Sequence, residues 1–165
     1  MCSCGCRPKN NNLHYLVGGK LNMEKITDKD KEDIRQITSA EEIMKFLGNG
    51  KTLNNKQFDE FMDNIKSGKE KFFKLTDKNK LIGIIGISEF LKYPSLTIAL
   101  KKEEQGKGYL KKALELFAKE YNKNFFIIVK ENNKKMLNIA NKHFKYVGRR
   151  LLYGVKYVYI YEYSV

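Results

Sequence analysis

The residues best suited to chemistry in this 165-residue sequence lie in one short turn, Gln105-Gly106-Lys107-Gly108-Tyr109. An apolar segment typical of a β-strand, residues 96–100, precedes the turn, and an amphipathic pattern typical of a helix follows it. Two glycines ahead of a helix allow the main chain to approach a ligand closely and leave N–H groups unpaired. The helix dipole favours negative charge at the same place. We therefore expect this turn to bind a phosphate-bearing cofactor.

The three cysteines are a second set of reactive side chains, and all lie in Cys2-Ser3-Cys4-Gly5-Cys6. A thiolate metal site usually has four ligands at wider spacing, so His14 would have to serve as the fourth ligand. Acylation of these cysteines beside a basic patch is a second interpretation, and it would attach the chain reversibly to a membrane. A tail with exposed thiols is the third interpretation and the one we favour. We predict no metal site.

The formal net charge is +13, and residues 101–165 hold 15 Lys or Arg against 6 Asp or Glu. A basic surface of this kind suits nucleic acid or a nucleotide cofactor. The composition gives a plainer explanation, because Lys, Asn, Ile and Tyr are abundant together. Lys also far outnumbers Arg, the residue that more often reads phosphates and bases in a bidentate way. We therefore do not expect nucleic acid as a partner.

Length and hydropathy favour a single domain with its own core. No apolar run approaches the roughly 18 to 20 residues of a membrane span, so we expect no transmembrane segment. No apolar segment of the signal-peptide kind follows Met1, and we expect a soluble, cytoplasmic protein. Residues 1–22 read as an irregular leader with a short strand-like stretch at 13–17, and residues 23–165 read as the domain.

The periodicity beyond the leader predicts helices first, then strands, then an alternation of both. Capping boxes are expected at Thr27–Asp30 and at Ser39–Glu42, and glycines end several of the helices. Hairpin turns are expected at 77–79 and 93–95. The expected strands are residues 23–26, 71–75, 81–87, 96–100, 125–129, 146–153 and 156–164. The expected helices begin at Thr27 and Ser39, cover 55–67 and 110–121, and follow a cap at Asn132 or Asn133.

The last strand places Tyr157, Tyr159, Tyr161 and Tyr163 on one face. A row of aromatic side chains is able to stack nucleic acid bases. Packing against a layer of helices is the commoner reason for aromatic residues at a period of two, and we favour it.

This order of elements, with the glycine turn between the fourth strand and the next helix, resembles the GNAT superfamily of N-acetyltransferases. Gln105-Gly106-Lys107-Gly108-Tyr109 is similar to the family's glycine signature. Ile98-Ala99-Leu100 stands where the family has its Leu-x-Val strand end, and Val129–Asn132 followed by His143-Phe144 is similar to a further family segment. The resemblance covers residues 23–165. It implies an α/β (α+β) fold with a mixed, mostly antiparallel sheet of about seven strands flanked by about four helices.

The resemblance also implies acetyl-CoA as co-substrate and a site for it. In this family the fourth and fifth strands splay apart, and the pantetheine arm lies in the gap. Main-chain groups of Ile98 and Leu100 would then bond the arm, and Asn132 matches an asparagine that contacts it. The N–H groups of residues 105–110 would hold the diphosphate; these residues are Gln105, Gly106, Lys107, Gly108, Tyr109 and Leu110. Lys107, Lys101 or Lys102 would neutralise part of its charge.

The implied reaction is the attack of an amine on the thioester, which needs a base for the amine and an acid for the leaving thiolate. The tyrosine that commonly serves as this acid falls on Ile139 or Ala140, and Glu89 is the nearest carboxylate for the base. The acceptor amine belongs to a small molecule or a protein. An inactive GNAT-fold subunit that binds a protein partner is the alternative function, and a basic nucleic-acid-binding domain is the third.

Overall fold

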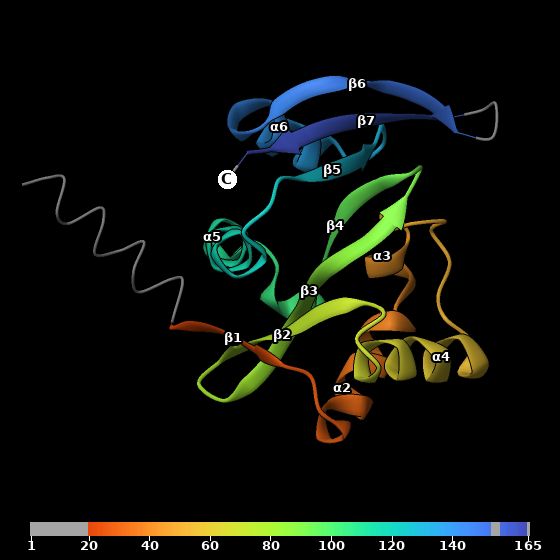
Figure 1. The fold of residues 1–165 in the computed structure, drawn as a ribbon, viewed down its shortest axis with the longest axis vertical. Coiled ribbons are helices and arrows are strands. Elements are labelled where there is room, and N and C mark those ends of the chain that lie inside the picture. The colour runs from red at the N-terminus through yellow and green to blue at the C-terminus, as the bar shows by residue number, and fades with distance from the viewer. Residues whose placement is uncertain (1–19, 153–155, 165) are drawn as a thin grey trace, which may run out of the picture.

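The computed structural model describes residues 20–152 and 156–164, in which seven strands form one mixed sheet with the order β1-β2-β3-β4-β5-β7-β6 (Figure 1). The strands are β1 Leu21–Lys25, β2 Lys71–Asp77, β3 Lys80–Phe90, β4 Tyr93–Leu100, β5 Phe125–Lys130, β6 Lys145–Leu152 and β7 Lys156–Tyr163. The α-helices are α2 Lys31–Thr38, α3 Glu41–Met44, α4 Asn55–Lys66, α5 Tyr109–Tyr121 and α6 Lys134–His143. Two 3-10 helices, η1 Asp28–Asp30 and η2 Lys102–Glu104, complete the described elements. The expected fold class is confirmed, with five α-helices where about four were expected.

The cysteines, His14 and the strand-like stretch at 13–17 lie outside the described residues, as does Gly154, expected to join the last two strands. The first strand begins at Leu21, two residues before the expected start. The boundary between leader and domain stays a prediction.

The first four strands are joined by antiparallel pairing into a meander. The turn expected at 77–79 is confirmed, because Lys78 and Asn79 both have positive φ, as a two-residue hairpin turn requires. The turn expected at 93–95 is wrong. The chain reverses at Leu91 and Lys92, which also have positive φ, and Tyr93 already begins β4. Pro94 is tolerated there because it stands near the start of its strand.

Of the two capping boxes expected before β2, the structure has one. The capping box at Thr27–Asp30 is confirmed: the Asp30 carboxylate accepts a hydrogen bond from the Thr27 N–H at 2.7 Å. The box expected at Ser39–Glu42 is wrong. Ala40 is the N-cap of α3, and the Ser39 hydroxyl instead donates to the carbonyl of Gln36 in the helix before it. The segment is therefore two short helices that meet at Ser39 and Ala40.

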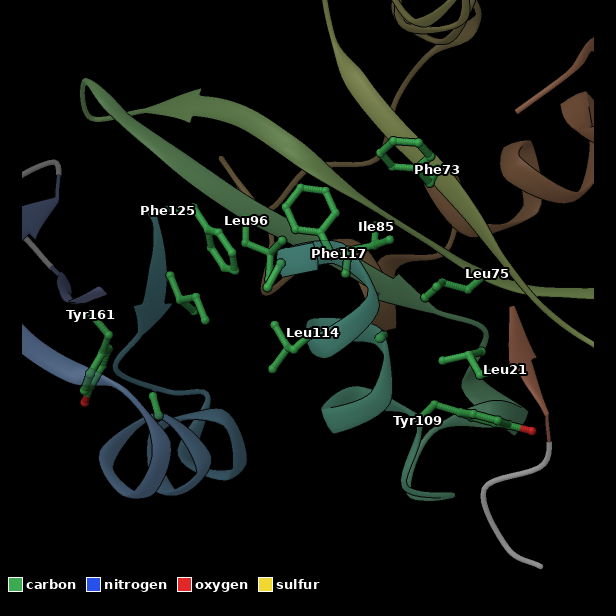
Figure 2. Packing of buried hydrophobic residues seen from close by; sticks show 14 of the residues in the cluster. Leu21, Phe73, Leu75, Ile85, Leu96, Tyr109, Leu114, Phe117, Phe125 and Tyr161 are labelled. Carbon is green, nitrogen blue, oxygen red and sulfur yellow. The ribbon is translucent and has the colours of Figure 1, made fainter. Parts of the chain in front are cut away.

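The sheet is covered on both faces, and each face has its own apolar core. Residues of α2, α3 and α4 pack with Ile84 and Ala99 on one face. Residues of α5 and α6 pack with Ile85 and Leu96 on the other. In Figure 2, Phe117 of α5 lies near the centre of the second core, with Phe73 of β2 and Ile85 of β3 on one side and Leu96 of β4 and Phe125 of β5 on the other. Its ring centroid is 6.3 Å from that of Phe73 and 5.5 Å from that of Phe125.

Three of the four tyrosines on this face of β7 belong to the second core, so the packing interpretation is confirmed for them. The fourth, Tyr157, instead lies against the guanidinium group of Arg149, 4.5 Å from the ring centroid. Tyr161 is fully buried, and its hydroxyl donates to the amide oxygen of Asn141 in α6 at 2.7 Å. Tyr159 and Tyr163 pack at the margin of the same core. On the opposite face of β7, Val158 and Ile160 are buried as well.

Candidate functional site

The sheet opens between β4 and β5. Among the described residues these parallel neighbours share one pairing, Ser95 with Phe126. On its other side β4 pairs with β3 along its whole length, from Tyr93–Phe90 to Leu100–Gly83, and β5 pairs with β7. Beyond Ser95 the two strands therefore present edges to one another that carry no strand-to-strand pairing.

The pairing of β4 with β3 determines which main-chain groups face this gap. Lys101 N–H donates to the carbonyl of Ile82 at 2.9 Å, so the pair Lys101–Ile82 is of the hydrogen-bonded kind. Hydrogen-bonded and non-hydrogen-bonded pairs alternate in an antiparallel ladder. Leu100 and Ile98 therefore belong to non-hydrogen-bonded pairs, and their N–H and C=O groups point away from β3, into the gap. These are the two residues that the family resemblance assigned to the pantetheine arm.

The glycine turn lies at the end of β4, where α5 begins. Gly106 and Gly108 have φ values of +78° and +84°, which L side chains rarely adopt, and a Cβ at Gly106 would meet no atom within 4 Å. Within the described part of the chain, nothing accepts a hydrogen bond from the N–H of Gly106, Lys107 or Gly108. The first turn of the 13-residue α5 contains no acidic residue. The turn is thus open, and its N–H groups are available to an anion.

A buried carboxylate lies beneath the turn. Glu104 is 6% exposed, and its two oxygens contact Lys107 Nζ at 3.0 Å and Lys80 Nζ at 3.4 Å. The hydrogen bond from Lys107 is the main cause that lowers the pKa of the Glu104 carboxyl below its ordinary value, and Lys80 adds to the effect. Glu104 therefore stays ionised and links the turn to the start of β3. Lys107 is bound by Glu104, and so its charge reaches an anion in the turn only in part.

A second polar contact fixes the start of α5. The Tyr109 hydroxyl donates to Asp77 Oδ2 at 2.6 Å, and burial followed by this hydrogen bond raises the pKa of Tyr109 to about 12. Figure 2 shows the Tyr109 ring beside Leu21. Oδ1 of Asp77 is buried without a partner among the described residues. Glu104 and Tyr109 thus anchor both ends of the turn to the β2–β3 hairpin.

The other residues expected to bind the cofactor differ in their contacts and in their exposure. Gln105 Nε2 donates to the carbonyl of Leu100 at 3.2 Å, so the amide caps one of the gap-facing groups. Leu110 is partly buried in the first turn of α5, against the apolar core. Asn132 is exposed in the turn between β5 and α6, and it is Asn133 that caps α6 by accepting from Met136 N–H. Lys101 is paired with Asp33 of α2.

Glu89 lies apart from these residues. It is exposed and stands opposite Pro94, next to the hairpin end of β3 and β4. The glycine turn follows the other end of β4. At about 3.3 Å per residue of an extended strand, that end lies about 20 Å from Pro94. Along β3, Glu89 shares its face with Ile85 and Ile87, the face of α5.

Three charged contacts of the site did not follow from the sequence analysis: Glu104 with its two lysines, Asp77 with Tyr109, and Lys130. Lys130 Nζ donates to the carbonyl of Lys45 at the end of α3, 3.1 Å away. Burial, and secondarily Lys156, lower the pKa of Lys130. The short separation of Glu104 and Lys107, three positions apart in the chain, was the one available signal.

One surface groove lies elsewhere, between β1 and α5. Its volume is about 560 Å³, and it is lined by Met23, Leu116 and their neighbours, none of them a residue of the gap or the turn. Of the helices in the described ranges, none is both long and apolar enough to span a membrane.

Comparison with known proteins points to one family. The family model for the acetyltransferase (GNAT) domain matches residues 20–143. No curated protein sequence gives a significant match.

Solved structures share the fold at low identity. The acetyltransferase from Salmonella typhimurium that modifies the N-terminal serine of ribosomal protein L7/L12 superposes with a TM-score of 0.71 at 17% identity, covering 90% of this chain and 97% of that one. Spermidine N-acetyltransferase from Vibrio cholerae, solved with CoA and spermine, gives 0.69 at 19% identity, covering 87% and 95%. The microcin C7 self-immunity acetyltransferase, solved with acetyl-CoA and AMP, gives 0.68 at 21% identity, covering 90% and 94%.

Proposed function

Because the chain belongs to the GNAT family of acetyltransferases, we propose that it transfers the acetyl group of acetyl-CoA to an amine. The observation that carries this proposal is the combination of an open turn at residues 105–110 with an unpaired stretch of β4 beside it. The open turn suits a diphosphate, and the unpaired stretch of β4 suits an extended arm that contains amide groups. The turn and the stretch are contiguous. Acetyl-CoA contains both groups in that order.

The binding mode follows from the groups that the fold leaves free. The N–H groups from Gly106 to Leu110 would hold the diphosphate at the start of α5, where the helix dipole favours it. The N–H of Gln105 already donates to the Lys102 carbonyl, so this residue would contribute through its side chain.

The pantetheine arm would bond the N–H and C=O of Ile98 and Leu100 as an added strand would. The Gln105 side chain must then release the Leu100 carbonyl, which it occupies in the free protein. Asn132, exposed past the end of β5, would contact the arm from the other side of the gap.

The chemistry requires an amine to lose a proton and a thiolate to gain one. Glu89 remains the proposed base. Its place at the hairpin end, on the α5 face of β3, means that it would act through water rather than by touching the amine. The helix position where a tyrosine acid would stand is Ile139, and so the thiolate would take its proton from solvent.

The acceptor is proposed as a class. The acetyltransferases of similar fold named above act on a protein N-terminal serine and on spermidine. Both acceptors are amines, and a small-molecule amine and a protein amine are the two candidates for this chain.

The test is calorimetry with acetyl-CoA on the wild type and on Gly106→Glu. The introduced carboxylate would stand at the diphosphate position, so we expect the affinity to fall by at least a factor of ten. Gly68→Glu is the matched control, because Gly68 has φ +77° against +78° at Gly106 and equally open surroundings. Equal binding by both variants, or no binding by the wild type, would contradict the proposal.

Activity is tested separately, by release of CoA thiol from acetyl-CoA in the presence of spermidine or of a peptide that begins with serine. Transfer to either amine supports the enzyme. Binding of acetyl-CoA without thiol release over a wide amine panel favours the alternative, an inactive GNAT-fold subunit. The exposed apolar side chains of the edge strand β6, Tyr146, Val147 and Leu151, would then be the first surface to examine for a partner.

A further inference from the structure

Two hydroxyl groups meet on the sheet where β4 begins to separate from β5. The Ser88 and Thr97 hydroxyl oxygens are 3.2 Å apart, from neighbouring strands β3 and β4. Thr97 is two residues past Ser95, the last residue of β4 that pairs with β5. It is also the one polar side chain between Ser95 and the end of β4 at Leu100.

Strand alternation places both hydroxyls on the face of α2, α3 and α4. Thr97 shares a face with Ala99, and Ser88 shares a face with Ile84, and both of these apolar residues pack in the core under α2–α4. The opposite face is filled at this level, since Leu96 and Ile98 pack against the core of α5. The two hydroxyls and the pair Leu96 and Ile98 therefore lie on opposite faces of the sheet beside the gap.

The length of the cofactor arm brings the thioester to the same level. With the diphosphate at the turn after Leu100, an extended pantetheine arm equals about four residues of strand, or roughly 13 Å. Measured back along β4, this places the sulfur close to Thr97. An arm that lies beside β4 as an added strand would is about 5 Å from a β4 side chain at the same level. A hydroxyl on that side chain is therefore able to reach the arm with a hydrogen bond.

We propose that Thr97, held by Ser88, contacts the acetyl thioester and donates a hydrogen bond to its carbonyl oxygen; this inference rests on the proposed function. In the transfer the amine nitrogen bonds to the carbonyl carbon and the C–S bond breaks. One amine proton leaves to water, and the thiolate takes a proton from water and departs as CoA thiol. As negative charge develops on the carbonyl oxygen, the Thr97 hydroxyl bond strengthens, and the Ser88 hydroxyl donates to Thr97 in turn.

The experiment compares wild type with Thr97→Val, which removes the hydroxyl and keeps the shape. Two quantities are measured: the ratio of acetyl-CoA affinity to CoA affinity by calorimetry, and the rate of thiol release with spermidine or a peptide that begins with serine. If neither probe is acetylated, slow hydrolysis of acetyl-CoA is the rate used. We expect the affinity ratio to fall about threefold and the rate to fall at least tenfold, with CoA affinity unchanged.

Thr97→Ser is the matched control and should recover most of both quantities, whereas Ser88→Ala should give a smaller loss. Thermal unfolding of each variant shows whether the fold is retained. An unchanged affinity ratio and rate in Thr97→Val would overturn the inference and leave the proposed function intact. Failure of the wild type to bind either acetyl-CoA or CoA would instead refute the proposed function itself. If neither wild type nor any variant releases thiol, the ratio of acetyl-CoA affinity to CoA affinity alone decides whether Thr97 contacts the thioester.

Discussion

Tyr109 shows how one side chain couples the anion turn to the rest of the molecule. It is the first residue of α5, its ring is buried, and its hydroxyl donates to Asp77 in β2. The hydroxyl therefore fixes the position at which the helix begins, and with it the direction of the free N–H groups. A loose helix start would present those groups to a diphosphate in several orientations, at an entropic cost to binding.

Tyr109→Phe should destabilise the protein by about 1 to 3 kcal/mol at neutral pH, because Asp77 loses its donor while it stays partly buried. Chemical denaturation measures this free energy. Lys111→Ala, an exposed change in the same helical turn, is the control and should lie within about 0.5 kcal/mol of wild type. A Tyr109→Phe variant as stable as wild type would show that the hydrogen bond does not hold the helix start.

The same substitution has a pH signature. The pKa of Tyr109 is raised from 10.0 to about 12 in the folded protein, so the folded state favours the neutral phenol. The contribution of this group to stability is complete below pH 10 and is lost as pH rises from 10 to about 12. The difference in unfolding free energy between wild type and Tyr109→Phe should therefore shrink over this range. A constant difference would contradict the raised pKa.

At the residue scale, the sequence was informative only where partners are close in the chain. The glycine turn was predictable, because positive φ at Gly106 and Gly108 and the start of a helix are local properties. The contacts beneath it were not, since Lys80 and Glu104 are separated by 24 positions and Asp77 and Tyr109 by 32. Such pairs follow only from the register of strands, which a single sequence does not specify.

At the element scale, β3 depends on two glycines for its close fit between β2 and β4. A Cβ at Gly86 would come within 2.4 Å of Phe72 Cγ and 2.5 Å of the Lys71 carbonyl oxygen. A Cβ at Gly83 would come within 2.5 Å of the Ala99 carbonyl oxygen. Backbone atoms of paired strands cannot move aside without breaking the ladder. The glycines therefore permit β3 to run as a central strand with both faces covered.

Gly86→Ala should cost about 2 to 3 kcal/mol, because the added methyl group must displace the Phe72 ring and the backbone of β2. Gly148→Ala is the matched control on the edge strand β6, where an added Cβ meets no atom within 4 Å. Urea unfolding of both variants tests the comparison, and Gly148→Ala should be neutral or slightly stabilising. Equal losses in the two variants would mean that the contact with β2 does not limit the substitution.

The elements themselves were mostly predictable, and the errors have identifiable causes. Apolar periodicity gave every strand and the long helices, since burial on one face or both is encoded locally. The turn placed at 93–95 was wrong because Pro94 reads as a turn residue, whereas Leu91 and Lys92 carry no signature of positive φ. The box at Ser39 was wrong because α2 continues to Thr38 and uses Ser39 as its C-cap. The gap between β4 and β5 came from the family resemblance, not from periodicity.

At the scale of the whole molecule, the sheet consists of two parts joined by little main-chain pairing. Strands β1 to β4 form one part and β5, β7 and β6 the other, with Ser95–Phe126 as the described ladder contact between them. The core under α5 also connects the two parts, because Phe117 contacts aromatic rings from both of them. A ligand in the gap would bind main-chain groups of both parts and so add a link across the point where the sheet is weakest.

Hydrogen exchange with and without acetyl-CoA tests this arrangement. We expect slower exchange at the N–H groups of Ile98, Leu100 and residues 106–110, which the ligand would cover. In β1, at the far edge of the sheet, exchange should change little. At a ligand concentration of 100 times the dissociation constant, the global free energy of unfolding should rise by about 2.7 kcal/mol. Gly106→Glu should show neither effect, whereas Gly68→Glu should show both.

Protection confined to the turn, with Ile98 and Leu100 unchanged, would mean that only the diphosphate is held and that the arm lies outside the gap. Equal protection over all strands, with no excess at Ile98, Leu100 or residues 106–110, would indicate stabilisation of the fold without the expected site. The expected pattern is specific because the ladder fixes which N–H groups point into the gap: those of Ile98 and Leu100 do, and that of Ala99 between them is turned toward β3. Ala99 should therefore exchange slowly in both states, and this alternation along β4 distinguishes an added strand from contact with side chains alone.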